Sequence, residues 1–415
     1  MRKRWRVAAV CVCMAMLTCA CSARAEKEEP SVQPEAAEEK EETPEEAAES
    51  AKQAKLGAIS PSAYGNIDGL DLEPGTYFSV IGKSESEEYW KAVKEGAVAA
   101  VNDLNEALGF EGADKLKVVY SGPGESDNVD EQVSILDEEL DRYPSALAIA
   151  VIDSKSCNVQ FDLATQNGIP IVTYDSASSY QGTMADIMTN NAEAAAEAAV
   201  HMAEALGEEG QVLVFAHDSK SLTSQQRVES FVNELQSNHP EMSVTETYYM
   251  DKFDELKKQI ARERAGIADP EDGDAAEVSA EDRTAEEAAV AEAAQAITDD
   301  EVYDYIFEQN PDIKGIYATN GESVVKMADL CEQKEKEDIV IMGYDADAEE
   351  VQALKDGRIA GVVMQNPYGM GYAAIVAEAR CVLELGNEAE IDTGYTWVTA
   401  DNVNDKEVQR MLYAK

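Results

Sequence analysis

The feature that most constrains the fold is an alternation of short apolar runs with helix-like segments between residues 315 and 367. Each of three strand-length runs is followed by a polar residue. The runs are residues 315–318, 339–343 and 359–364, and the residues that follow are Asn320, Asp345 and Gln365. Because the carboxyl ends of parallel strands meet at one edge of a sheet, we expect these side chains to face one crevice. Two amides and a carboxylate are suited to binding hydroxyl groups.

The same alternation continues towards the N-terminus, and it predicts an α/β fold built on doubly wound parallel sheets. Strand-like runs at 76–82, 115–120, 146–152 and 169–174 alternate with helix-like segments at 89–108, 130–140 and 158–167. A dinucleotide-binding enzyme would show this rhythm too, but its first turn needs closely spaced glycines without carboxylates. Here the turn holds one glycine, Gly82, followed by Glu85 and Glu87, which excludes a Rossmann dehydrogenase.

The charge of the chain limits its partners. Its 415 residues include 83 acidic and 34 basic side chains, a formal net charge of −49. Such a chain repels phosphate groups, which argues against nucleic acid and anionic lipid surfaces as partners. Cys157, Cys331 and Cys381 are far apart, and we interpret them as free thiols, with one disulfide among them as the alternative. With only three histidines, the sequence predicts no metal site, and no motif indicates a cofactor.

The N-terminus has the pattern of an export signal. A basic start, residues 1–6, precedes an apolar segment, residues 7–17, that is too short to span a membrane. Residues 17–21, Leu-Thr-Cys-Ala-Cys, resemble a lipoprotein box, which predicts a signal of residues 1–21 and lipidation of Cys21. The alternative is plain secretion with cleavage after residues 23–25, Ala-Arg-Ala.

The next segment is strongly acidic. Residues 26–50 contain eleven Glu and two Lys, so we expect residues 22–74 to form a flexible, disordered linker. Residues 262–298 are also rich in Ala and Glu, and there we expect an acidic insertion made of a mobile loop and an exposed helix.

The order of segments after residue 315 resembles that of a known family. The order is a strand, Asn, a helix, a strand followed by Gly-Tyr-Asp, a helix that ends in Asp-Gly, and a strand followed by Gln-x-Pro. This order is similar to that of the ribose-type branch of the type I periplasmic binding proteins, the sugar receptors of ABC importers. The resemblance covers residues 77–415. It implies two lobes joined by a three-crossing hinge. The N-terminal lobe would hold residues 75–189 and 366–394, and the C-terminal lobe residues 190–365 and 395–415.

The resemblance also implies further ligand contacts. Tyr89 and Trp90 fall where the family places paired aromatic residues, of which at least one would stack on a sugar ring, while core packing of one is the alternative. Arg227 lies in a segment similar to the family's Arg-x-x-Gly-Phe and would donate to ring oxygen and hydroxyls, unless it is a surface arginine. Phe253 would close over the sugar or pack in the core, and Glu87 replaces an amide of relatives.

Two aspartates end strands of the first lobe. The family often has Asp-Arg where this chain has Asp175-Ser176, so Asp175 is a ligand candidate whose neighbouring arginine is missing. Asp153 contacts the ligand or caps a helix. Because Glu87 and Ser176 both differ from the family pattern, the identity of the sugar stays open.

These features predict an exported, monomeric solute-binding protein that captures a sugar or polyol and delivers it to an ABC permease. It would be a lipoprotein anchored on the outer face of the cytoplasmic membrane, or periplasmic. The alternative is a receptor that presents its ligand to a membrane kinase or chemoreceptor. A surface hydrolase that uses Asp175 and Asp345 is a third interpretation, but no nucleophile–base motif accompanies these residues, so we predict no enzymatic activity.

Overall fold

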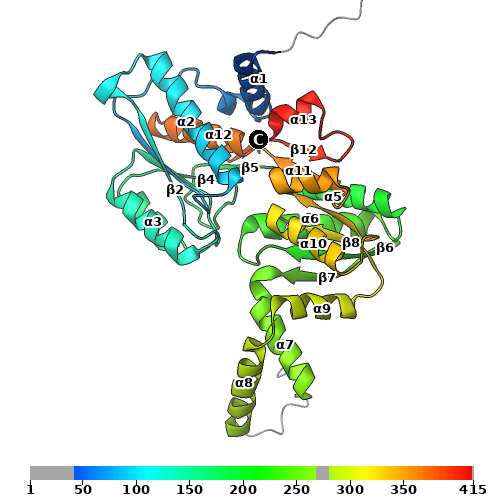
Figure 1. Ribbon diagram of the computed structural model, residues 1–415. Coiled ribbons are helices and arrows are strands. Elements are labelled where there is room, and N and C mark those ends of the chain that lie inside the picture. The colour runs from blue at the N-terminus through cyan, green and yellow to red at the C-terminus, as the bar shows by residue number, and fades with distance from the viewer. Residues whose placement is uncertain (1–41, 268–279, 414–415) are drawn as a thin grey trace, which may run out of the picture. The chain divides into compact units, whose positions relative to one another are not determined.

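Two six-stranded sheets organise the described residues, 42–267 and 280–413, of this computed structural model (Figure 1). The first sheet has the order β11-β5-β4-β3-β1-β2, and the second has β12-β10-β9-β8-β6-β7. Neighbouring strands are parallel, except that β12 runs antiparallel to β10. The predicted two-lobed α/β fold is therefore confirmed.

The strands of the two sheets follow one another along the chain. Those of the first sheet are β1 (Tyr77–Ile81), β2 (Lys117–Ser121), β3 (Ala146–Ile149), β4 (Ile171–Tyr174), β5 (Asp186–Met188) and β11 (Glu390–Asp392). Those of the second are β6 (Gly210–Ala216), β7 (Met242–Tyr249), β8 (Ile313–Ala318), β9 (Val340–Tyr344), β10 (Gly361–Gln365) and β12 (Tyr395–Val398).

Helices cover both faces of each sheet. They are α1 (Pro44–Gly57), α2 (Glu88–Leu108), α3 (Val129–Asp141), α4 (Asn158–Gln166), α5 (Asn191–Leu206), α6 (Leu222–Asn238), α7 (Phe253–Ala265), α8 (Ala280–Gln295), α9 (Asp299–Gln309), α10 (Gly321–Gln333), α11 (Ala348–Lys355), α12 (Pro367–Val382) and α13 (Lys406–Met411). Short 3-10 turns are η1 (Ser62–Gly65), η2 (Gly112–Asp114) and η3 (Met250–Lys252).

Each buried strand supplies side chains to two cores. In β3, Ala146 and Ala148 pack towards α2 and α12, whereas Leu147 and Ile149 pack towards α3 and α4. This alternation follows from the two-residue period of a strand, and it explains why such strands are almost continuously apolar.

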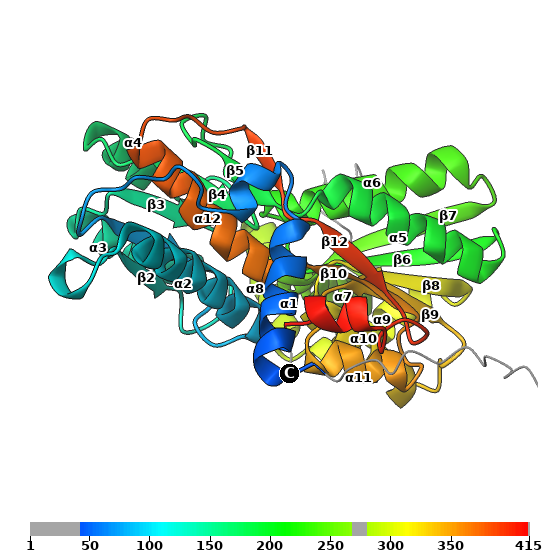
Figure 2. The ribbon, with the colours of Figure 1, turned by 90° about the horizontal axis from the view of Figure 1, so that it is seen from above.

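Within residues 42–267 and 280–413, the chain passes between the lobes at three places. After β5 in the first sheet, α5 packs on strands β8, β9 and β10 of the second. After β10 in the second sheet, α12 packs on β3, β4 and α2 of the first, and β11 and β12 then belong to different sheets (Figure 2). Each lobe is thus completed by a helix that follows a strand of the other lobe.

The expectation of a flexible linker is wrong for residues 44–72. Residues Pro44–Gly57 form α1, and Leu56, Ile59 and Tyr64 are buried in the core beside α12. The ion pair between Lys52 and Asp103, at 2.7 Å, attaches α1 to α2, and the Lys55 ammonium donates to the Leu412 carbonyl in the second lobe at 3.1 Å. After Lys55 the segment contains enough apolar residues to pack into a core, although the average composition of residues 22–74 is acidic. Residues 22–41 lie outside the described part.

The acidic insertion is only partly described. After α7 ends at Ala265, helix α8 packs against it (Figure 1). Val290, Ala294 and Ile297 are buried in the core of the second lobe, while most other described side chains of α8 are exposed. The expected exposed helix is therefore present, with one packed face. The expected loop falls mainly on residues 268–279, outside the described residues.

Cys157, Cys331 and Cys381 are free thiols, so the disulfide alternative is wrong for these three. Among the described helices, none is long and apolar enough to span a bilayer. Within the same residues, no three His, Cys, Asp or Glu side chains are grouped so as to hold a metal ion.

Candidate ligand-binding site

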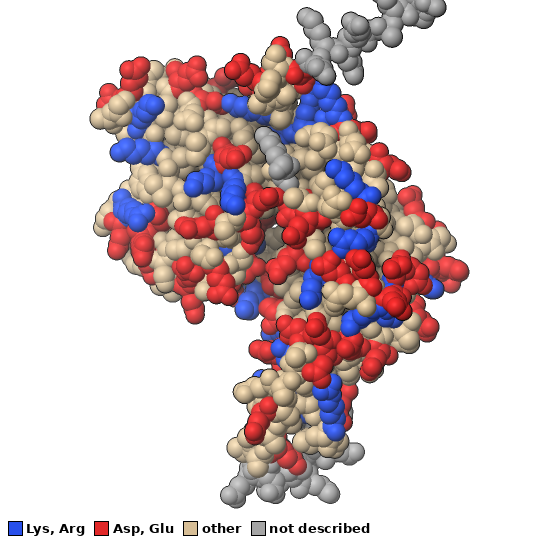
Figure 3. Space-filling model, in the orientation of Figure 1, with Lys and Arg blue, Asp and Glu red and all other residues tan. Residues whose placement is uncertain are grey.

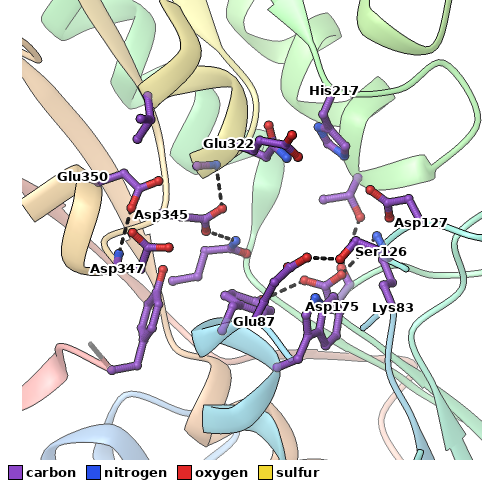
Figure 4. A pocket seen from close by; sticks show the side chains of 18 of the residues that line it. Lys83, Glu87, Ser126, Asp127, Asp175, His217, Glu322, Asp345, Asp347 and Glu350 are labelled. Atoms are coloured by element: carbon purple, nitrogen blue, oxygen red, sulfur yellow. Dashed lines mark hydrogen bonds and ion pairs between the residues drawn. The ribbon is translucent and has the colours of Figure 1, made fainter. Parts of the chain in front are cut away.

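A cavity of about 330 Å³ lies between the lobes, at the carboxyl ends of strands from both sheets (Figures 3 and 4). Its lining residues are Lys83, Glu87, Tyr89, Trp90, Ser126, Asp127, Asp175, His217, Thr223, Arg227, Asn320, Gly321, Glu322, Val325, Asp345, Asp347, Glu349, Glu350, Gln365 and Tyr413. The volume lies within the range of small-molecule sites, and this edge of parallel sheets is where such sites form.

In the second lobe, a connected polar network forms one wall. The Gln365 amide donates to Asp345 Oδ1 at 2.7 Å, and the backbone N–H of Gly321 donates to Asp345 Oδ2 at 3.0 Å. The carbonyl of Gln365, a residue only 2% exposed, accepts from Arg227 at 2.9 Å. Burial raises the pKa of the Asp345 carboxyl, although Arg227 and the two hydrogen bonds oppose this shift. These contacts fix the orientation of the carboxylate.

Arg227 is held on several sides. It also donates to Asn191 Oδ1 at 2.8 Å and to the Thr319 carbonyl at 2.7 Å, and its guanidinium lies 3.8 Å from the Tyr344 ring centroid. These bonds and the one to Gln365 use three of its five N–H groups. Arg227 is 3% exposed, so the alternative of a surface arginine is wrong, because α6 turns this side chain inwards.

In the first lobe, Asp175 is the centre of a second group. The Tyr89 hydroxyl donates to its Oδ1 at 2.7 Å, and the Lys83 ammonium lies 3.3 Å from its Oδ2. Burial alone would lower the pKa of Lys83, but the carboxylates of Asp175, Asp127 and Asp218 outweigh it and raise that pKa. Lys83 therefore stays cationic although it is only 7% exposed.

The two aromatic candidates both line the cavity. The rings of Tyr89 and Trp90 meet edge to face with centroids 5.1 Å apart, and Trp90 is packed in the core against Tyr174. Tyr413, from the C-terminal segment, contacts the other side of Tyr89 with centroids 5.8 Å apart. Tyr89 is the more accessible of the candidate pair, since it is only partly buried.

Asn320 lines the cavity and also caps a helix. Its side-chain oxygen accepts from the Ser323 backbone N–H at 3.1 Å and caps α10 in a reciprocal capping box. Its remaining amide donors are what it can offer to a ligand.

Carboxyl groups surround the mouth of the cavity. Glu87 is exposed there and accepts from the Ser126 hydroxyl. Partial burial, followed by the charges of Asp127, Glu322 and Asp345, raises the pKa of Glu87 to about 7. Deeper in the second lobe, burial and the neighbouring Asp347 raise the pKa of Glu350 to about 10, so Glu350 is neutral at pH 7.

Two predicted residues are not in the cavity. Phe253 is 8% exposed and packs edge to face on Tyr303 with centroids 5.1 Å apart, so the core alternative is right for it. Asp153 does not line the cavity, and its side chain accepts from the Lys155 backbone N–H at 2.8 Å. It therefore stabilises a loop turn and does not cap α4, whose N-cap is Cys157.

Sequence reasoning missed other lining residues, including Lys83, Asp127, Glu322 and Tyr413. Lys83 and Asp127 follow β1 and β2, and Glu322 follows β8, so the rule that loops after parallel strands line the crevice contained the signal for them. Tyr413 reaches the cavity from the end of the chain, where no strand pattern pointed to it.

Comparisons with known proteins agree with this architecture. The model of a family described as "Periplasmic binding protein domain" matches residues 78–301 and 278–380. An arabinose-binding protein, AraP, from Geobacillus stearothermophilus is 25% identical with a TM-score of 0.59, and the alignment covers 80% of this chain and 99% of that one. No curated protein matches the sequence.

Two further solved structures share the fold. A solute-binding protein from Agrobacterium vitis, bound with α-D-tagatopyranose, is 22% identical with a TM-score of 0.64, covering 82% of this chain and all of that one. A sugar-binding protein of an ABC transporter from Bacillus halodurans is 23% identical with a TM-score of 0.60, covering 79% and 99% of the two chains. The chain belongs to the periplasmic binding protein family, whose members are solute-binding proteins that act outside the cytoplasm.

Proposed function

We propose that this protein captures a sugar or polyol in the cavity between its lobes and delivers it to the transmembrane subunits of an ABC importer. The observation that carries this proposal is the polar network of Arg227, Gln365 and Asp345 opposite Tyr89 and Trp90 in one interlobe cavity. A fixed carboxylate accepts from hydroxyl groups, the remaining guanidinium and amide donors donate to them, and an aromatic face covers the C–H face of a ring.

The oriented network favours a hydroxyl-rich solute over an apolar one. Asp345 is positioned by two donors, and Gln365 is positioned by Arg227 and by the Thr189 hydroxyl at 3.1 Å. An apolar solute would leave these buried groups without water and without a partner, which costs free energy. The ligands named for structural neighbours, arabinose and tagatopyranose, support the same class.

Binding would draw the lobes together. Candidate contacts come from both lobes, Tyr89, Trp90 and Asp175 from the first and Arg227, Asn320, Asp345 and Gln365 from the second. A solute that touches both walls stabilises the closed arrangement through hinge motion at the three connections, and the closed form would dock on the permease.

We further propose that the protein acts as a monomer tethered outside the cytoplasm through a lipid on Cys21. Cys21 and most of the acidic segment that follows it lie outside the described residues, so this part of the proposal depends on the sequence pattern. Membership of a family of binding proteins leaves no support for the hydrolase interpretation.

A thermal-shift screen against neutral sugars and polyols tests this function, because a ligand that binds only the native state raises its melting temperature. The best ligand is then titrated calorimetrically into the wild type and Asp345→Ala. We expect the variant to bind at least about tenfold more weakly, since hydroxyl and amide donors lose their acceptor.

The matched control is Asp338→Ala, which removes an exposed aspartate just before β9 and should leave the affinity unchanged. A screen without any melting shift would refute the proposed solute class. Equal affinity in wild type and Asp345→Ala would remove Asp345 from the site.

A further inference from the structure

The lining of the interlobe cavity is far more acidic than a neutral solute requires. Only Lys83 and Arg227 among the lining side chains are permanently cationic. The carboxyl groups are those of Glu87, Asp127, Asp175, Glu322, Asp345, Asp347, Glu349 and Glu350. Figure 3 shows acidic side chains gathered on both sides of the hollow between the lobes. The site is defined by the cavity and by the family, so these carboxyl groups bear on which solute it takes.

Both cations are already engaged within the protein. The Lys83 ammonium lies 3.3 Å from Asp175 Oδ2, and the pair is buried. Arg227 donates to Asn191, Thr319 and Gln365 and is stacked on Tyr344. Within the described residues, neither cation forms an ion pair with an exposed carboxylate at the mouth.

Three carboxylates at the mouth are not ion-paired with either cation, although the charge of Asp127 acts on Lys83. They are Glu87 and Asp127 from loops of the first lobe and Glu322 from the start of α10 in the second, and Figure 4 shows them around the same hollow. Within the described part of the chain, no ion pair to a basic side chain is found for any of the three. The side-chain partners of Glu87 there are neutral, namely the Ser126 hydroxyl and the Trp90 side chain.

These groups are close enough to act on one another. The charges of Asp127, Glu322 and Asp345, after partial burial, raise the pKa of Glu87 to about 7. Closure of the lobes around a neutral solute would exclude water from these like charges and increase their repulsion. A metal ion is not the matching cation, because the described side chains form no group with metal-holding geometry.

We propose that the natural solute is an aminated sugar or polyol, whose protonated amine lies among Glu87, Asp127 and Glu322 while its hydroxyls reach Asp345, Gln365 and Arg227. This inference rests on the proposed function, since it places the hydroxyls on the same wall. The ammonium supplies a positive charge next to Glu87 and Glu322, for which the described residues provide no ion pair. A simple aliphatic amine resembles the Lys ammonium, with a pKa of about 10.4. The neighbouring oxygens of an amino sugar lower the pKa of its amine, but most of the amine is still protonated at pH 7.

The test compares matched solutes by titration calorimetry at pH 7. Each pair differs in one group: sorbitol with 1-amino-1-deoxysorbitol, glucose with glucosamine, and galactose with galactosamine. N-acetylglucosamine and N-acetylgalactosamine serve as neutral solutes that keep the nitrogen. We expect at least one amine to bind about tenfold or more tightly than both its hydroxyl and its N-acetyl counterpart, and the advantage to shrink as salt is added.

Charge-removing variants locate the effect. The double variant Glu87→Gln/Glu322→Gln should lose most of the preference for the amine, and both side chains are exposed, so folding is not at stake. Glu85→Gln/Glu125→Gln is the matched control, because these two glutamates are exposed in the same loops of the first lobe but do not line the cavity. The control should keep the preference.

The outcomes separate this inference from the proposed function. If neutral sugars bind as tightly as their amines, or more tightly, the aminated class is refuted and sugar capture stands. If no member of either set binds while the thermal-shift screen finds a neutral sugar or polyol, the aminated class is refuted and sugar capture stands; if that screen also finds none, both proposals fall. If the control variant loses the preference as fully as the lining variant, the net charge of the protein and not the mouth explains it, and the proposed site is refuted.

Discussion

Asp175 in the first lobe and Asp345 in the second occupy matching places with different partners. Each follows a tyrosine at the end of the third strand of its sheet, β4 or β9, and each has a positive φ, 57° and 72°. Their backbone N–H groups donate to the neighbouring strand at 2.8 and 2.9 Å. Asp tolerates this left-handed conformation better than most residues.

The difference lies in what surrounds the two carboxylates. Asp175 pairs with the buried cation of Lys83, whereas Asp345 is held by neutral donors, the Gln365 amide and the Gly321 N–H. The same backbone position therefore carries an ion pair in one lobe and an amide network in the other. The repeated fold fixes the backbone position of each aspartate. Residues from other parts of each lobe determine whether its carboxylate forms an ion pair or accepts hydrogen bonds from neutral donors.

The largest effect should come from removing the charge at each position in turn. Asp175→Asn leaves the Lys83 ammonium buried without its ion-pair partner, although Asp127 and Asp218 still act on it, and we expect a loss of about 3 kcal/mol of unfolding free energy. Asp345→Asn places one amide donor opposite another and should cost about 1–2 kcal/mol. Urea unfolding of both variants measures the difference.

A double variant serves as the control for this comparison. Lys83→Met/Asp175→Asn removes the uncompensated cation and should recover much of the loss caused by Asp175→Asn. Equal losses in the two single variants would mean that Asp175 and Asp345 are electrostatically alike, which contradicts the contrast between the lobes.

The helices that cross between the lobes extend the comparison. Helix α5 buries mainly alanines against the second sheet, whereas α12 buries Glu378, which is 0% exposed, in the first. Neither oxygen of Glu378 has a hydrogen-bond partner among the described residues, and burial raises its pKa well above the ordinary value. We expect Glu378→Met to raise the unfolding free energy by about 1–3 kcal/mol at pH 7.

The sign of the pH dependence follows from the raised pKa. The native state keeps the proton of Glu378 while the unfolded state loses it above the ordinary pKa of 4.5, so the wild type loses stability as the pH rises. The advantage of Glu378→Met, measured by urea unfolding, should therefore be smaller at pH 4 than at pH 7. Glu106→Met, at an exposed position of α2, is the control with an expected change under about 0.5 kcal/mol. A destabilised Glu378→Met would show that the carboxyl is favourably placed.

Sequence patterns predicted the parts of the site that depend on strand ends. Asp175 and Asp345 directly follow buried strands and Gln365 ends one, and parallel sheets bring such residues to one edge, where all three line the cavity. That they bind a solute stays a prediction. Phe253 and Asp153 were predicted to contact the ligand but do not line the cavity. The direction in which the helix turns Phe253 and the course of the loop that carries Asp153 depend on tertiary packing, which no local sequence pattern encodes.

The N-terminal segment shows a different limit. Averaged over residues 22–74, composition indicates disorder, yet Leu56, Ile59 and Tyr64 are buried beside α12. A few apolar residues at suitable spacing are enough to order a segment when it can pack on an existing surface, here that of α12. The average composition of about fifty residues does not reveal them.

The smallest effect concerns Glu87, which faces carboxylates of both lobes. Its pKa of about 7 lies above the ordinary 4.5, so the native state binds its proton more tightly, and the stability it contributes is lost as the pH rises from about 4.5 to 7. Glu87→Gln should therefore melt at the same temperature as the wild type at pH 4 and up to about 2 °C higher at pH 8. Glu85→Gln, exposed in the same loop but outside the cavity, should show no such divergence between the two pH values. Because Glu322 and Asp345 belong to the second lobe, replacing both by their amides should reduce this divergence without abolishing it, since burial and Asp127 also raise the pKa of Glu87. An undiminished divergence would mean that the charges of the second lobe do not act on Glu87 across the cavity.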